Sequence, residues 1–98
     1  MQKEMMKLIG MLILSGIPYE ITECWGTPQV WYPCKAEPVC DVICHEGSYG
    51  YKEGLLEMMG LLTDEEAEDD DVVGWLSAVE VFLRIQSDYV ERKLGIIK

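Results

Sequence analysis

The sequence is poor in basic residues, contains a single histidine and lacks a long apolar segment. Eight Lys and Arg residues stand against 18 Asp and Glu residues, which gives a net charge of −10. A nucleic-acid-binding protein needs a basic face, and an anionic membrane surface attracts basic segments, so neither is an expected partner. The apolar run Leu8–Leu14 has seven residues, whereas about 20 are needed to span a bilayer.

The N-terminus does not fit a secretory signal either. Glu4 lies where a signal peptide is positively charged, and no small-residue cleavage site follows the apolar run. A buried amphipathic helix is the better interpretation of this segment. We therefore expect a cytoplasmic protein, a compartment in which thiols stay reduced.

Recognisable catalytic motifs are missing. The chain has neither a Walker loop nor a dinucleotide-binding fingerprint. Cys44 and His45 are adjacent in a predicted strand, so their side chains point to opposite faces and do not form a nucleophile–base pair. With 18 acids in the chain, chance pairs of carboxylates are common and have no specificity. We predict a protein that is not an enzyme and that uses no cofactor.

The four cysteines have a spacing that does not favour a metal site. Only Cys40 and Cys44 approach the short spacing of zinc knuckles. In a straight strand these two residues lie about 13 Å apart, too far for one metal ion. We expect Cys24, Cys34, Cys40 and Cys44 to be small buried apolar side chains. A zinc site that Cys24 and Cys34 join from neighbouring strands, and a disulfide, are the alternatives.

Most of the excess negative charge lies in one short segment. Seven of the eight residues from 64 to 71 are acidic, and the rest of the chain has a net charge of only −3. One interpretation is a solvated helix start that keeps the protein soluble. The other is a docking surface for a basic protein, since a cationic groove relieves the repulsion and steers association. The acids of this segment are Asp64, Glu65, Glu66, Glu68, Asp69, Asp70 and Asp71.

The first half of the chain predicts one helix followed by three strands. Apolar residues recur at helical spacing over 2–15, and Gly16 is suited to end that helix. Alternating or β-rich segments follow at 19–25, 29–32 and 39–45. Short connections between successive strands predict an antiparallel meander.

The second half predicts mainly helices. A very apolar stretch predicts a short helix over 53–62, built on Leu55, Leu56, Met58, Met59, Leu61 and Leu62. Thr63 with Glu66, and Ser77 with Glu80, have the spacing of capping boxes. The first box opens a short acidic helix, and the second opens a final helix over 78–93. Val72–Leu76 is a connector or an edge strand.

Together these elements predict a single α+β domain over residues 1–98. A small antiparallel sheet of three or four strands would pack against the N-terminal helix and two or three C-terminal helices. The burial of the aromatic residues depends on a strand register that the sequence does not fix. Tryptophans that lie outside the core would be apolar contacts for a partner protein. The candidates are Trp25, Trp31 and Trp75.

A glycine- and tyrosine-rich loop is the candidate ligand site. Its glycines would let backbone N–H groups approach an anion, its tyrosines would stack on a base, and its lysine would meet a phosphate. The alternative is a flexible strand-to-helix turn in which the glycines supply positive φ angles. The residues concerned are Gly47, Ser48, Tyr49, Gly50, Tyr51 and Lys52.

Several stretches of the chain resemble a family of small uncharacterised proteins carried by phages, prophages and plasmids of gut Firmicutes. The resemblance covers the chain from about residue 17 and supplies no catalytic residues. It implies a context in which small acidic proteins bind and inhibit host defence proteins, such as CRISPR effector nucleases. The stretches are Glu23–Gln29, Ile43–Tyr51, Gly54–Glu57, Val73–Ala78 and Val81–Phe82.

Three functions follow from the sequence. The first is an inhibitor that binds a basic host defence protein through the acidic segment and the tryptophans. The second is an oligomeric sponge that sequesters a nucleotide signal in the glycine–tyrosine loop. The third is a structural homo-oligomer in which the apolar N-terminal helix and residues 58–62 pack against a copy of the chain.

Overall fold

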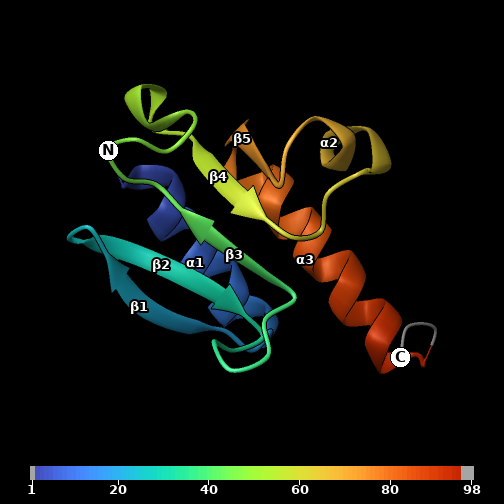
Figure 1. Cartoon of the computed structure of the whole chain (residues 1–98). Helices are drawn as coiled ribbons and strands as arrows, with labels where there is room; N and C mark the ends of the chain where they lie inside the picture. Colours follow the sequence, from blue (N-terminus) through green and yellow to red (C-terminus); the bar gives the residue numbers. More distant parts are fainter. Residues whose placement is uncertain (1, 96–98) are drawn as a thin grey trace.

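Residues 2–95, which the computed structural model describes, form a five-stranded antiparallel sheet and three α-helices (Figure 1). The strands follow one another in the sheet in chain order, as a continuous meander. A one-turn 3₁₀ helix at Tyr51–Glu53 precedes the fourth strand. The elements are α1 (Lys3–Ser15), β1 (Glu20–Cys24), β2 (Thr27–Tyr32), β3 (Cys40–Ile43), β4 (Leu56–Met59), α2 (Asp64–Asp69), β5 (Val72–Leu76) and α3 (Ala78–Lys93).

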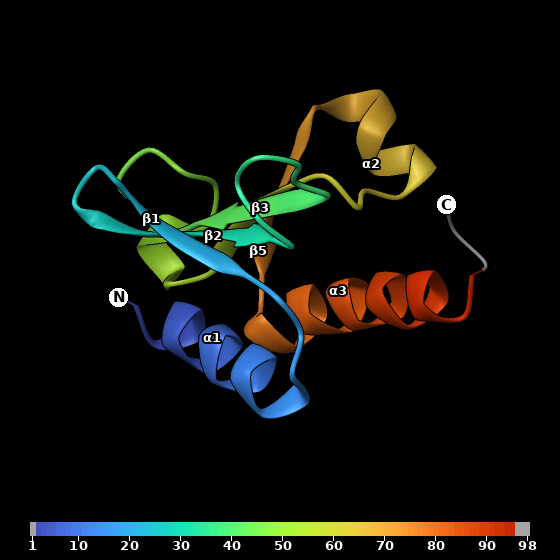
Figure 2. The ribbon, with the colours of Figure 1, turned by 90° about the horizontal axis from the view of Figure 1, so that it is seen from below.

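Helices α1 and α3 lie side by side and cover one face of the sheet (Figure 2). Val30, Val42 and Met58 form a cross-strand row through β2, β3 and β4, and all three side chains are fully buried. The apolar stripe of α1 packs onto this face. The helical side of the core comprises Met5, Leu8, Ile9, Leu12, Ala78, Val81 and Ile85.

The helix boundaries have local causes. Gly16 takes the left-handed conformation with φ 67° and ends α1, because a residue without Cβ adopts it freely. Ser77 and Glu80 form the predicted capping box, and α3 begins at Ala78, directly after the N-cap Ser77, as expected. Thr63 and Glu66 form the second capping box, so the acidic segment does open a short helix, α2.

The prediction of three or four strands is wrong, because the sheet has five. The apolar stretch 53–62 is not a helix. It contains the 3₁₀ turn and then β4, in which Leu56 and Met58 are buried while Glu57 and Met59 face outward. Val72–Leu76 is the edge strand β5, which pairs with β4. Leu and Met carry no β-branch, so their helical propensity suggested the wrong element.

The face of the sheet opposite α1 and α3 has polar links between strands. Trp31 of β2 donates from Nε1 to the Thr22 hydroxyl at 2.8 Å, and Gln29 donates to Asp41 at 2.8 Å. These two hydrogen bonds link β2 to β1 and to β3 through partly buried side chains.

The predicted burial of the cysteines holds for two of them. Cys40 and Cys44 are buried, whereas Cys24 and Cys34 are half-buried, and no disulfide joins the four. Burial raises the pKa of the Cys40 thiol to about 12. Across residues 2–95, no helix has the length and apolar character that crossing a membrane requires.

Candidate functional site

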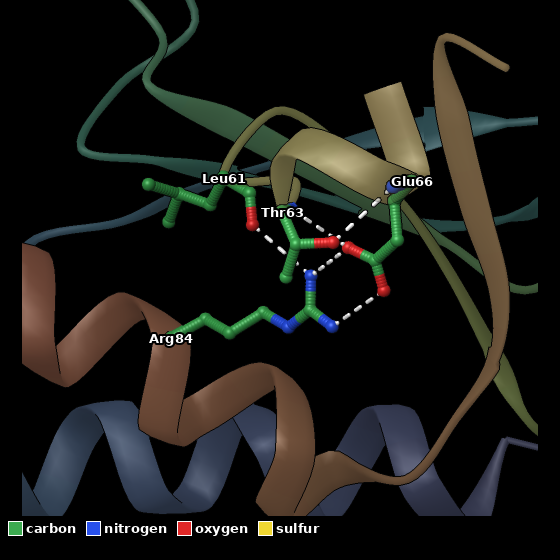
Figure 3. Close-up of polar contacts among 4 residues, drawn as sticks. All are labelled: Leu61, Thr63, Glu66 and Arg84. Carbon is green, nitrogen blue, oxygen red and sulfur yellow. Dashed lines mark hydrogen bonds and ion pairs between the residues drawn. The ribbon is translucent and has the colours of Figure 1, made fainter. Parts of the chain in front are cut away.

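The acidic helix α2 is fixed in place by one arginine of α3. Arg84 donates from Nη1 and Nη2 to the two carboxylate oxygens of Glu66 at 2.7 and 2.9 Å (Figure 3). Nη1 also donates to the backbone oxygen of Leu61 at 3.1 Å. Glu66 accepts the backbone N–H of Thr63 at 2.9 Å as part of the capping box. One carboxylate thus joins the start of α2, through Arg84, to the core helix α3.

These contacts change the acid–base behaviour of Glu66. The hydrogen bonds from Arg84, followed by the N–H of Thr63, lower the pKa of Glu66 from 4.5 to about 2. Such charge-assisted, bidentate pairs are stronger than neutral hydrogen bonds. Glu66 therefore serves the structure of the protein, and its charge is neutralised within the chain.

The other six acids of the segment are presented to solvent. Each of them is exposed, and none takes part in the ion pairs found within residues 2–95, which are Glu66–Arg84 and Asp88–Arg92. The Asp70 carboxylate accepts the neighbouring N–H of Asp71. Because α2 is an ordered helix held in one orientation, these exposed carboxylates form a concentrated negative surface. We call Asp64, Glu65, Glu68, Asp69, Asp70 and Asp71 the acidic surface.

The predicted partner-contacting tryptophans do not all lie beside the acidic surface. Helix α2 connects the end of β4 to the start of β5. Trp25 occupies the β1–β2 turn and Trp75 lies near the end of β5, so both are at the opposite end of the sheet. Trp31 pairs with Asp41, which pairs with Met59, and Met59 pairs with Val72. Trp31 therefore shares a cross-strand row with the residue that follows the acidic surface.

Two stacked aromatic pairs lie at the end of the sheet away from α2. The Trp25 ring stacks on His45, with centroids 5.1 Å apart, and the Tyr49 ring stacks on Trp75 at 5.5 Å. His45 and Tyr49 come from one tight turn. The Ser48 hydroxyl closes this turn, because it donates to the His45 carbonyl and accepts the His45 N–H. We call Trp25, His45, Tyr49 and Trp75 the aromatic edge.

Both tryptophans of the aromatic edge have an unfavourable backbone conformation. Trp25 has φ 53° and Trp75 has φ 55°. Both values lie in the left-handed region, which costs a bulky residue about 1–3 kcal/mol. Trp25 and Gly26 form a two-residue turn with both φ values positive, a turn that strongly favours Asn-Gly. Both tryptophans are nevertheless exposed, to 78% and 55%, so burial does not offset the strain.

Two glycines allow the turn 45–49 to lie directly on β5. A Cβ on Gly74 would lie 2.2 Å from the Cβ of Tyr49, and a Cβ on Gly50 would lie 2.9 Å from the backbone N of Trp75. Leu56 of β4 pairs with Leu76 of β5, and Met58 pairs with Val73. The β5 segment between these pairs is one residue longer than the β4 segment. The extra residue of β5 is a bulge, and it turns Trp75 outward.

The predicted ligand residues are brought together by the fold. Gly47, Ser48, Tyr49, Gly50, Tyr51 and Lys52 line a hollow of about 400 Å³, together with Glu46, Glu53 and Trp75. Ser48 is buried and its hydroxyl is used within the turn. Lys52 is the only basic residue in the lining, against two glutamates. The hollow therefore has aromatic walls and a net negative charge, which disfavours a phosphate ligand.

Several residues of these two surfaces escaped the sequence analysis. Arg84 lies 18 residues from its partner Glu66. The contacts of His45 with Trp25 and of Gly74 with Tyr49 join residues that are far apart in the sequence. For β4, the available signal was that Gly54 and Gly60 lie inside the predicted helix 53–62, where each glycine disfavours a helix relative to alanine.

Metal sites and relatives add no further assignment. Within the described part of the chain, no three His, Cys, Asp or Glu side chains are grouped so that they could hold a metal ion. Comparisons with protein-family models, curated proteins and solved structures gave no match.

Proposed function

We propose that the protein binds another protein and that the acidic surface docks onto a basic groove of that partner. The observation that carries this proposal is the combination of six exposed carboxylates without an ion pair within residues 2–95 and a helix held in one orientation by Arg84. Fixed like charges repel one another in the free protein, so a cationic partner relieves a cost that is already present. The same field speeds the encounter with that partner.

The proposed partner is a nucleic-acid-binding protein of host defence, for example a CRISPR effector nuclease. This choice rests on the resemblance to small phage and plasmid proteins, and on the chemistry of the partner. A groove built to hold phosphates offers the row of Lys and Arg side chains that the acidic surface complements. Occupation of that groove by carboxylates would inhibit the nuclease by excluding its substrate.

The test is inhibition of a purified CRISPR effector nuclease by the wild type and two charge variants. Asp69→Asn with Asp71→Asn removes two charges near the C-terminal end of α2, where acids are unfavourable to the helix dipole. This variant should therefore fold at least as well as the wild type. Glu23→Gln with Glu37→Gln removes two exposed charges outside the acidic surface and is the matched control.

We expect the Asp69/Asp71 variant to inhibit more weakly, by roughly 2- to 30-fold, on the basis of about 0.2–1 kcal/mol per exposed charge pair. The Glu23/Glu37 variant should inhibit like the wild type. Equal inhibition by all three proteins would remove the acidic surface from the mechanism.

The alternative of a nucleotide sponge receives less support from the geometry. The hollow exists and contains Tyr49, Tyr51 and Lys52, but Glu46 and Glu53 belong to its lining. For the alternative of a homo-oligomer, the fold places Met5, Leu8, Leu12 and Met58 in the core. These side chains are therefore used within one copy of the chain, whereas Met6, Ile13, Leu14 and Met59 are exposed.

A further inference from the structure

The aromatic edge is a second surface whose features folding alone does not require. Trp25 and Trp75 are exposed, strained at φ and stacked on His45 and Tyr49. A free surface tryptophan would sample several rotamers, whereas these rings are oriented by a stacking partner on one side. Both tryptophans nevertheless keep more than half of their surface exposed to solvent. Preorganised, exposed aromatic rings are typical of binding surfaces, where ordering costs are met in advance.

The charges around the Tyr49–Trp75 pair select the kind of group that can bind there. Glu46 and Glu53 line the hollow beside Trp75. Glu57 accepts the backbone N–H of Tyr49 at 2.9 Å and so places a third carboxylate next to the stacked pair. Lys52 supplies the only positive charge in the lining. A phosphate or carboxylate ligand would meet a net negative field, whereas a cation would be attracted.

We propose that the Tyr49–Trp75 pair of the aromatic edge receives an arginine side chain of the partner protein. The guanidinium group stacks on an aromatic face, with Trp the best ring, and its N–H groups can donate to carboxylates at the same time. A lysine ammonium can use the charge but not the planar stacking. This inference rests on the proposed function, since it deepens the chemistry of the same basic partner. It adds a second contact at the opposite end of the sheet from α2.

The probes are two peptides of equal length and charge, hexaarginine and hexalysine, titrated by calorimetry. The key variant is Trp25→Asn with Trp75→Asn. Asn tolerates the left-handed conformation, and Asn-Gly is the favoured sequence for the turn at Trp25, so this variant should keep the fold. Leu14→Ala is the control, because it removes an apolar side chain that is 89% exposed on α1.

We expect the wild type and Leu14→Ala to bind hexaarginine more tightly than hexalysine. The Trp25/Trp75 variant should lose roughly 2- to 30-fold in affinity for hexaarginine and little for hexalysine. Arginine also pairs better with carboxylates, so the decisive quantity is the change in the arginine-to-lysine ratio between the two proteins. An unchanged ratio in the Trp25/Trp75 variant overturns the inference.

The Asp69/Asp71 variant separates this result from the proposed function. If the acidic surface binds cations, the Asp69/Asp71 variant has lower affinity for both peptides by a similar factor. The ratio of its affinities for hexaarginine and hexalysine then stays unchanged. Wild-type affinity of this variant for both peptides counts against the proposed function while the arginine preference still stands. A third outcome is that the Asp69/Asp71 variant loses affinity while the Trp25/Trp75 variant keeps the wild-type arginine-to-lysine ratio. This result retains the proposed function and refutes the arginine contact.

Discussion

Arg84 donates two hydrogen bonds to Glu66, at 2.7 and 2.9 Å, and this pair decides where the acidic surface lies. Without it, α2 would be a six-residue helix, too short to be stable alone, with no side-chain link to α3. The capping box at Thr63 orders the first turn, and the side chain of Arg84 joins that turn to the core helix α3. The acidic surface is therefore displayed by a tertiary contact and is not merely a charged loop.

Removal of the arginine should loosen α2. We expect Arg84→Met to lower the free energy of unfolding by about 1 kcal/mol, because the Glu66 carboxylate and the Leu61 carbonyl each lose a donor. Urea denaturation at neutral pH measures the loss, and amide hydrogen exchange should show faster exchange in α2. Arg84→Lys keeps the charge but not the forked geometry, so its free energy of unfolding should lie between those of the wild type and Arg84→Met. Unchanged exchange in α2 would show that Arg84 does not order the helix.

The same pair predicts a dependence of stability on pH. The pKa of Glu66 is about 2 in the folded protein against an ordinary value of 4.5. Its contribution is therefore fully present above about pH 4.5 and is lost as the pH falls toward 2. The stability difference between wild type and Glu66→Gln should shrink over that interval. Glu65→Gln, which removes an exposed carboxylate without an ion pair, is the control, and an equal pH effect in both variants would contradict the assignment.

Glycine-to-alanine substitutions should distinguish a required close contact from ordinary helix propensity. Gly74→Ala places a Cβ 2.2 Å from the Cβ of Tyr49 and should destabilise the protein by about 1–3 kcal/mol. Gly10→Ala, in α1, meets nothing within 4 Å and should stabilise it by about 0.5–1 kcal/mol. Thermal unfolding of both variants measures these shifts. Equal effects would mean that the turn 45–49 does not rest on β5 as described.

The cysteines should react in two classes. Cys24 and Cys34 are half-buried, whereas Cys40 and Cys44 are buried and their thiol pKa values are raised by that burial. Because the thiolate is the reactive form, Ellman's reagent should modify Cys24 and Cys34 in the native protein. Cys40 and Cys44 should react only after unfolding in guanidinium chloride. Rapid modification of all four in the native state would contradict the packing of β3.

Local signals in the sequence were sufficient for the helices and insufficient for the full sheet. The capping boxes at Thr63 and Ser77 act within four residues, so the starts of α2 and α3 were predictable. The alternation of Leu56 and Met58 was hidden by Leu55 and Met59, which made the stretch look uniformly apolar. The prediction of a helix over 53–62 therefore failed, and the strand count failed with it.

The arrangement of the candidate surfaces depends on that strand count. With β4 and β5 in the sheet, the chain reverses twice more, and Trp75 lies at the opposite end from Asp71 although four positions separate them in sequence. The stacking of Trp25 on His45 and of Tyr49 on Trp75 follows from the same pairing. Such contacts arise from long-range strand register, which composition and spacing do not encode.

The most direct measurement is the dissociation constant of the complex with a purified CRISPR effector nuclease at about 50 and about 300 mM sodium chloride, since screening lengths differ strongly between them. We predict that affinity falls steeply with salt for the wild type and for the Glu23/Glu37 variant. The Asp69/Asp71 variant should bind more weakly at the lower salt concentration and depend less on salt. Absence of binding, or a salt dependence identical in all three proteins, would contradict a docking role for the acidic surface.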